Sequence, residues 1–333
     1  MATGAASKSG AKSVRSGGLA SLGLQPRFLA IWVALAGLML LGALFLPRSV
    51  QPSAVISILP LAAFLAIAAM GQALVIMARG IDLSVPAIVT LSSTLLLGVS
   101  GGSDDAMLIG CVAALAGAAV VGLINGVLVA VLRLNSLIVT LAVGSIISGV
   151  TLWYRQSLPA EARVPAALSD FGSARFLGLN SSIWIALILT ALLTLLLRKT
   201  IPGRRFEAVG ANPEAAHASG LEIMRYQGGA FVAAALLYGV VGIMLSAFIR
   251  NPTLEVGAPY LLAPIAAAVL GATSISGGIG SMVAVLGAAL FLTQLGQMLK
   301  LIGLATSYQL IIQGAAIAIG MWLSTRFEGR GRR

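Results

Sequence analysis

The stretch VGAPYLLAPIAAAVLGATSISGGIGSMVAVLGAALFLTQLGQML (Val256–Leu299) contains no charged residue. An α-helix rises about 1.5 Å per residue, so about 20 apolar residues cross the hydrocarbon core of a bilayer. The stretch is more than twice as long, and its middle holds TSISGGIG (Thr273–Gly280), where glycine favours a tight turn with positive φ. We therefore predict two membrane-spanning helices joined by that turn.

The rest of the chain has the same character. Of its 333 residues, 59% are hydrophobic and 9% are charged, whereas soluble domains average about 25% charged residues. Only helices and closed barrels satisfy the backbone inside a bilayer, and the apolar runs lack the alternation of barrel strands. Charged residues delimit further candidate spans at Phe28–Leu46, Val50–Ala78, Leu83–Gly101, Ala106–Leu132, Leu134–Trp153, Phe176–Leu197, Gln227–Ile249 and Leu301–Thr325. The prediction is an all-α integral membrane protein with about ten transmembrane helices.

The basic residues indicate the orientation. With the N-terminus in the cytoplasm, 15 of the 21 Lys and Arg residues fall on the cytoplasmic side and 6 on the other. Cytoplasmic loops carry such an excess. We expect both termini in the cytoplasm, a transmembrane domain over residues 27–325 and a basic tail at 326–333. Residues 1–26, rich in Ser, Gly and Ala with no acidic residue, are expected to be a disordered basic tail, with a transit peptide as the alternative.

Several kinds of protein are disfavoured by the composition. The net charge of +11 comes from residues scattered at span ends, which argues against a nucleic-acid surface. Because Cys111 and His217 are each the only residue of their type, we expect no disulfide, no metal and no cofactor. No phosphate-binding G-x-x-x-x-G-K-[ST] loop occurs, and no cluster of His, Asp and Glu suggests a membrane-embedded enzyme. We do not expect an enzyme with its own ATPase site.

The predicted cytoplasmic loop, residues 198–226, contains VGANPEAAHASG (Val209–Gly220), a short helix with well-marked ends. Asn212 can cap its start, Pro213 suits the first helical position, and Glu214 is favourable in the first turn. Gly220 can close it in a left-handed conformation. Small side chains would let a groove of another protein approach closely, at Ala215, Ala216, Ala218 and Ser219. The alternative is an ordinary loop helix lying on the membrane.

Asp82 is the charged residue nearest the interior of a span. It can be a gating or proton-coupled carboxylate, as an ion-coupled secondary transporter would need. Alternatively it caps the span that begins beside it, with Arg79 as counter-charge. In either case it can shape the cytoplasmic mouth of a pathway.

Other polar residues within the spans are candidates for a translocation path, since amides and hydroxyls both donate and accept hydrogen bonds. Gln294 and Gln297 share one helix face, as do Gln309 and Gln313. The single candidates are Gln72, Asn125, Thr140 and Ser145. The alternative role is hydrogen bonding between helices, alongside small faces such as Gly122-x-x-x-Gly126.

GANPEAAHASGLE (Gly210–Glu222) resembles the cytoplasmic coupling loop of bacterial ABC-transporter permeases for ribose, xylose and similar monosaccharides. Three more stretches resemble the same family: GQALVIMARGIDLSV (Gly71–Val85), GLINGVLVAVLRLNSLIVTLAVGSIISGV (Gly122–Val150) and APIAAAVLGATSISGGIGSMVAVLGAAL (Ala263–Leu290). Together they cover most of the chain. Permeases for branched-chain amino acids are more distant relatives, so another small polar solute, such as a branched-chain amino acid or a nucleoside, stays open as the substrate. The family usually has glycine where this chain has Arg79, Pro86 and Ala272.

The resemblance implies two permease subunits, identical or different, with cytoplasmic ATPases and a periplasmic substrate-binding protein, in the bacterial inner membrane. The helix after Asn212 would dock in a cleft of the ATPase and transmit its closure to the spans. Two of the quoted stretches would contribute to the cytoplasmic mouth. The residues of Gly71–Val85 that would do so are Gly80, Asp82 and Ser84, and those of Ala263–Leu290 are Thr273, Ser274, Gly277, Gly278 and Gly280.

Overall fold

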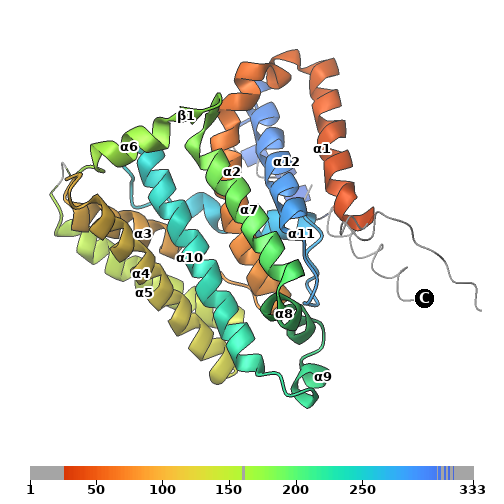
Figure 1. Cartoon of the computed structure of the whole chain (residues 1–333). Helices are drawn as coiled ribbons and strands as arrows, with labels where there is room; N and C mark the ends of the chain where they lie inside the picture. The colour runs from red at the N-terminus through yellow and green to blue at the C-terminus, as the bar shows by residue number, and fades with distance from the viewer. Residues whose placement is uncertain are drawn as a thin grey trace, which may run out of the picture.

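The computed structural model describes residues 26–159 and 162–305, and residues 307, 308, 311, 312, 314, 315 and 318. Long helices run between two ends of the molecule, with α8 and α9 at one end and α6 and β1 at the other (Figure 1). Nearly all of the first tail, the whole C-terminal tail and most of the tenth predicted span, including Gln309 and Gln313, lie outside the described residues.

The elements of the described part are α1 (Pro26–Phe45), η2 (Pro47–Val50), α2 (Pro52–Met77), α3 (Val85–Ser100), α4 (Met107–Gly126), η3 (Val127–Val131), α5 (Ser136–Gln156), α6 (Ala166–Ser173), β1 (Arg175–Phe176), β2 (Leu179–Asn180), α7 (Ser181–Lys199), α8 (Ile201–Ala211), α9 (Pro213–Ala218), α10 (Ile223–Ile249), η4 (Ala258–Tyr260), α11 (Ala263–Leu270) and α12 (Met282–Leu301). Of these, η3 is a π-helical continuation of α4, while η2 and η4 are 3-10 turns. The strands form a short antiparallel hairpin.

Among the described residues, 7 helices are long and apolar enough to cross a membrane: α1, α2, α4 with η3, α5, α7, α10 and α12. Each coincides with a predicted span. The third predicted span is α3, which has 16 residues. The sixth begins at Ser181 instead of Phe176, because the hairpin precedes it and the Asn180 side chain accepts a hydrogen bond from Ser182 N at the start of α7.

The eighth predicted span does not contain one membrane-length helix, so a crossing of the bilayer by this stretch stays a prediction. The stretch before the glycine-rich turn contains only η4 and the 8-residue α11, which is about 12 Å long. The backbone before α11 is held by another helix, since Gly257 N donates to Thr90 Oγ1 (3.2 Å) of α3. The break at Thr273–Gly280 is confirmed, because α11 ends at Leu270 and α12 begins at Met282.

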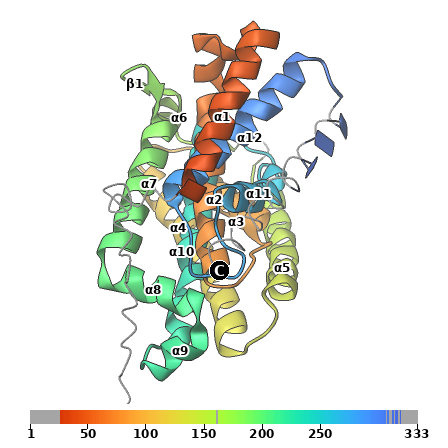
Figure 2. The ribbon, with the colours of Figure 1, turned by 90° about the vertical axis from the view of Figure 1, so that its right-hand side faces the viewer.

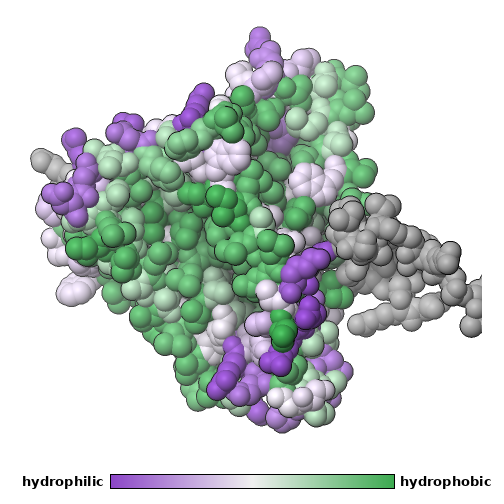
Figure 3. All heavy atoms as spheres, viewed as in Figure 1, coloured by the Kyte–Doolittle hydropathy of each residue, from purple (hydrophilic) through white to green (hydrophobic). Residues whose placement is uncertain are grey.

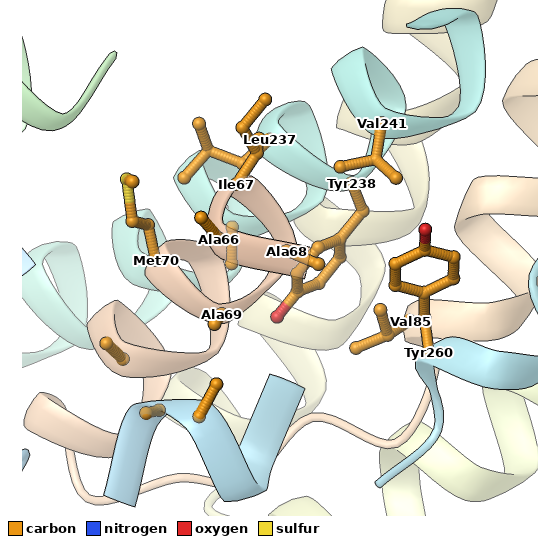
Figure 4. Packing of buried hydrophobic residues seen from close by; sticks show 14 of the residues in the cluster. Ala66, Ile67, Ala68, Ala69, Met70, Val85, Leu237, Tyr238, Val241 and Tyr260 are labelled. Atoms are coloured by element: carbon orange, nitrogen blue, oxygen red, sulfur yellow. The ribbon is translucent and has the colours of Figure 1, made fainter. Parts of the chain in front are cut away.

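The core lies between α2 and α10, the two most buried long helices of the described part. Ile67 and Ala68 of α2 lie toward Leu237 and Tyr238 of α10 (Figure 4). On a neighbouring face of α10, a Cβ added to Gly122 of α4 would meet Ala235 Cβ at 2.6 Å. Small residues therefore bring the helices close together, as predicted for the Gly122–Gly126 face.

The outer helices expose apolar side chains. Leu108 of α4 and Ile138 of α5 are each 70% exposed. Hydrophobic residues cover the middle of the face in Figure 3, and hydrophilic ones gather toward the ends. The views agree in placing α1 beside α12 (Figures 1 and 2), where Trp32 of α1 covers Gly287 of α12. This distribution suits a surface that meets lipid between two polar ends.

Candidate functional site

The segment between α2 and α3, residues 78–84, does not leave the bundle at the end of α2. Asp82 and Ser84 within it are fully buried. The turn begins at Arg79, whose φ of 67° is left-handed. Gly80 N donates to Val75 O (2.9 Å) and Arg79 N to Ile76 O (2.9 Å), the pair of bonds of a Schellman C-cap. The chain thus turns back among the helices immediately after α2.

Asp82 organises the end of this segment. Its Oδ1 accepts hydrogen bonds from Ser84 N (2.8 Å) and from Ser84 Oγ (2.6 Å). Asn125 of α4 donates from Nδ2 to Ser84 Oγ (2.9 Å). Asp82, Ser84 and Asn125 therefore form one hydrogen-bonded chain that links the segment to α4.

Gln72 of α2 holds the backbone of the same residue from the other side. In the amide orientation that satisfies both of its groups, Oε1 accepts from Asp82 N (3.2 Å), and Nε2 donates to Asp82 O (3.1 Å) and to Tyr238 Oη (3.1 Å). Tyr238 of α10 is fully buried. The backbone of Asp82 is thus paired by a side-chain amide that is itself tied to the central helix α10.

α5 pairs the remaining backbone of the segment. Leu83 N donates to Thr140 Oγ1 (2.9 Å), and Ile81 N donates to Ser136 Oγ (3.2 Å). The structure therefore brings together five of the predicted residues with Tyr238, and we call this set the polar cluster: Gln72, Asp82, Ser84, Asn125, Thr140 and Tyr238. Sequence reasoning missed Tyr238 and Ser136. A phenol in the middle of an apolar span was the available signal for Tyr238.

Two acceptor atoms of the polar cluster, Asp82 Oδ2 and Asn125 Oδ1, are buried without a hydrogen-bond partner among the described residues. Unpaired buried acceptors are costly. All six residues of the cluster are fully buried. In this conformation the cluster is closed to solvent.

The predicted capping role of Asp82 was wrong in its detail. The N-cap of α3 is Ser84, and it makes no side-chain cap bond. Arg79 is not the counter-charge of Asp82, because its guanidinium donates to Gly210 O (2.8 Å) and Ala211 O (2.7 Å) at the end of α8. Arg79 reaches away from the polar cluster toward the loop that carries α9.

The two described glutamines of α12 lie elsewhere. Gln294 donates from Nε2 to Ser49 O (3.1 Å), and Gln297 donates from Nε2 to Ala54 O (3.2 Å). They tie α12 to the chain around the start of α2, which supports the interhelical alternative for this pair. Ser145 bonds within its own helix, to Leu141 O (3.0 Å).

The glycine-rich segment after α11 forms the predicted tight turn, with positive φ at Gly277 (88°) and Gly278 (76°). Ser274 N closes the turn on Ile279 O (2.8 Å), and Gly278 N donates to Met77 O (2.8 Å) at the end of α2. A side chain on Gly280 would meet Met77, and Thr273 is buried. The two stretches predicted to lie at one mouth, Gly71–Val85 and Ala263–Leu290, are therefore in direct contact.

The predicted helix in the loop 198–226 is present as α9, and its caps are confirmed. Asn212 Oδ1 accepts from Ala215 N (3.1 Å), and Pro213 is the first helical residue. Gly220 has a φ of 78°, and its N donates to His217 O (2.9 Å). These bonds satisfy both ends of a very short helix locally.

One part of the predicted contact surface needs correction. Ala216 is 6% exposed and is therefore buried in its own loop, unavailable to a partner. The side chains of α9 and its C-terminal cap that are exposed are those of Glu214, Ala215, His217, Ala218 and Ser219. Small residues still dominate this exposed face.

A pocket of about 310 Å³ lies farther along α3, between α3, α5 and the chain before η4. Its polar lining comes from Thr90, Ser148, Thr151 and Glu255. Pro86, two residues after Ser84, also lines it, so the pocket begins about 3 Å along α3 from the polar cluster. Its volume is in the range of small-ligand sites, about 300–1,000 Å³.

These features define a polytopic α-helical membrane protein with a buried polar centre and a capped helix outside the apolar zone, the class to which solute permeases belong. The chain is a member of the family described as the permease component of branched-chain amino acid transport systems, whose model matches residues 54–321. Together with the sugar-permease relatives below, this match confirms the predicted resemblance.

Named relatives cover most of the chain. The ribose import permease protein RbsC of Bacillus subtilis (strain 168) is 33% identical over 289 residues, 84% of this chain and 87% of the relative. The L-arabinose ABC transporter permease protein AraH of Azospirillum brasilense is 35% identical over 254 residues, 72% of this chain and 70% of the relative. The autoinducer 2 import system permease protein LsrC of Salmonella paratyphi B is 33% identical over 276 residues, 81% of this chain and 77% of the relative. No solved structure matches the chain significantly.

Proposed function

We propose that the chain is the permease subunit of an ATP-binding-cassette importer and forms the path for a monosaccharide, delivered by a periplasmic binding protein and driven by separate cytoplasmic ATPases. The family supports the transport role, and relatives named for ribose and L-arabinose support the substrate class. Two copies of the chain, or one copy and a related chain, would complete the path.

The observation that carries the proposal is the exposed and fully capped α9. A helix of six residues is too short to be stable from its own hydrogen bonds. Caps at both ends hold it in shape while its small side chains face outward. That combination suits a rigid element that inserts into a groove of another protein, and we assign the ATPase as that protein.

Energy must come from such a partner, because the sequence has no phosphate-binding loop. In the proposed mechanism, movement of α9 opens and closes the pathway around residues 78–84. Opening would expose the polar cluster, whose unpaired Asp82 Oδ2 and Asn125 Oδ1 could then accept hydrogen bonds from sugar hydroxyls or water. The pocket along α3 offers the next space on that route.

The proposed orientation, with about ten spans and both termini in the cytoplasm, places α9 inside and the β1–β2 hairpin outside. In a Cys111→Ala background, Leu177→Cys should react with an impermeant thiol reagent added to intact cells. Leu177 is 91% exposed in the hairpin. His217→Cys on α9 should react only after the cells are permeabilised. Labelling of His217→Cys in intact cells would invert or refute this topology.

Reconstitution tests the function itself. Purified chain in liposomes, with the ATPase and binding protein that co-purify with it, should accumulate a labelled pentose only when ATP is present on the ATPase side. Chain alone should neither hydrolyse ATP nor accumulate sugar. Accumulation by the chain alone under a proton or sodium gradient would favour the secondary-transporter alternative, and uptake of a branched-chain amino acid or nucleoside instead of sugar would refute the substrate assignment.

A further inference from the structure

Three segments that are distant in the sequence meet at one point: the end of α2 (Met77–Arg79), the end of α8 (Gly210–Ala211) and the glycine turn (Gly277–Gly278). We call this point the Arg79 junction. Gly278 N donates to Met77 O (2.8 Å). A Cβ on Gly278 would lie 2.5 Å from Ala211 N, and one on Gly277 would lie 2.6 Å from Arg79 Cγ. The three backbones are therefore packed directly against one another.

The Arg79 side chain is the polar connection between α2 and α8 in this junction. Its Nε donates to Gly210 O (2.8 Å) and its Nη2 donates to Ala211 O (2.7 Å). A guanidinium presents several N–H groups in one rigid plane, so a single side chain can hold two successive carbonyls. These carbonyls belong to the last turn of α8, where a positive charge is also favoured by the helix dipole.

Through Arg79, the start of α9 is connected to the segment that contains Asp82. Ala211 directly precedes Asn212, the N-cap of α9. Arg79 is three residues before Asp82, whose side chain and backbone are held by the polar cluster. The Arg79 side chain thus connects Ala211, the residue before the N-cap of α9, to the segment 78–84 that packs over the polar cluster.

Arg79 makes this connection from an unfavourable backbone conformation. It occupies the position after a helix where glycine is preferred, with a φ of 67°. Ala272 occupies the equivalent position after α11, with a φ of 59°. An L-residue is strained in this region, so glycine would be easier at both places. At position 79 only the larger side chain can supply the bonds to α8.

We propose that Arg79 is a positioning residue that transmits movement of α9 to residues 78–84, so that ATPase closure is coupled to opening of the polar cluster. The inference rests on the proposed function. It assigns to Arg79 a role in coupling and none in binding the ATPase or the sugar, because the guanidinium is bonded within the chain.

The test is Arg79→Gly, which removes the two bonds and at the same time relieves the backbone. We expect this variant to insert, to be at least as resistant to thermal unfolding as the parent, and to bind the ATPase normally. ATP hydrolysis should continue, while the sugar transported per ATP falls about tenfold, the scale expected for losing charged hydrogen bonds. Arg79→Lys keeps the charge but not the planar fork, and should recover the ratio only in part.

Two matched variants separate coupling from other effects. Ala272→Gly relieves the same kind of backbone strain beside the same turn without removing a guanidinium. Arg133→Gly removes an arginine that also has positive φ (55°) and makes no side-chain hydrogen bond within the described residues. Both should keep the transport ratio of the parent. A parental ratio in Arg79→Gly, or an equal fall in Arg133→Gly, would overturn the proposal.

A readout without transport keeps this inference distinct from the proposed function. Amide hydrogen exchange of the complex, with and without a non-hydrolysable ATP analogue, should change in residues 209–222 and also in 78–84. In Arg79→Gly the first change should persist and the second should be lost. Loss of both, or of ATPase binding, would make Arg79 a structural residue only. Absence of sugar uptake by the parent complex, with these exchange changes intact, would contradict the substrate assignment and leave the coupling role standing.

Discussion

Ala215→Arg and Ala218→Arg are expected to abolish ATP-driven uptake while the chain still inserts and folds. Both side chains are exposed on α9, and neither residue takes part in its caps through its side chain. In a close-fitting groove of the ATPase, each arginine would add bulk and a charge without a partner. An unpaired buried charge costs about 3–5 kcal/mol, which is more than about a hundredfold in binding. Pull-down of the ATPase and uptake in liposomes measure the two effects.

Milder changes on the same helix are the controls. Ala215→Ser keeps the surface small and should transport like the parent. Glu214→Gln removes a first-turn charge that contributes about 0.3–1 kcal/mol and should weaken coupling only slightly. Ala216→Arg is unsuitable as a docking test, because Ala216 is buried and the change would disrupt the loop itself. Normal ATPase binding and uptake by Ala215→Arg and Ala218→Arg would show that α9 is an ordinary surface element.

Gly122→Val should have the largest effect on stability. A Cβ at Gly122 would lie 2.8 Å from Phe231 O and 2.9 Å from Val232 Cα. These are backbone atoms of the central helix α10, which cannot move aside as a flexible side chain can. Overpacking typically costs about 1–3 kcal/mol, and contact with backbone places this site at about 3 kcal/mol or more. The midpoint of thermal unfolding in detergent, followed by size-exclusion chromatography, should fall sharply, and less folded chain should be recovered.

Gly149→Val is the matched control. Gly149 lies in α5, another long apolar helix, and a Cβ there meets nothing within 4 Å. The substitution introduces the same β-branched side chain into a long apolar helix. It therefore measures the effect of a glycine-to-valine change that makes no contact with a neighbouring helix. Its unfolding midpoint should stay near that of the parent. Equal stability of Gly122→Val and Gly149→Val would mean that α4 and α10 are not packed as described.

Much of the fold follows from the order of residues alone, because the deciding forces are local or come from the bilayer. Apolar runs of sufficient length predict spans, and 7 such helices are present among the described residues. The caps of α9 were predictable from Asn212, Pro213 and Gly220, since each acts on backbone groups within a few residues. The break at Thr273–Gly280 was predictable for the same reason, and the motifs were sufficient to identify the family.

The tertiary structure decided where the polar side chains go, because their partners lie tens to hundreds of residues away. Asp82 was readable as a cap, but Gln72, Asn125 and Thr140 draw its segment into the bundle. Arg79 was predicted as a counter-charge, yet the carbonyls at the end of α8 lie closer to its guanidinium than any carboxylate of the described residues does. The eighth span is interrupted because α3 pairs with the backbone before α11.

Local sequence patterns also did not predict which side chains are buried. Ala215 and Ala216 are identical in type and adjacent in sequence, but only Ala216 faces its own chain. Composition and the local order of residues therefore determined that this is a helical membrane protein with a capped loop helix. Long-range packing alone determined which side chains are free to meet a partner, and how the loop helix is connected through Arg79 to the buried polar cluster.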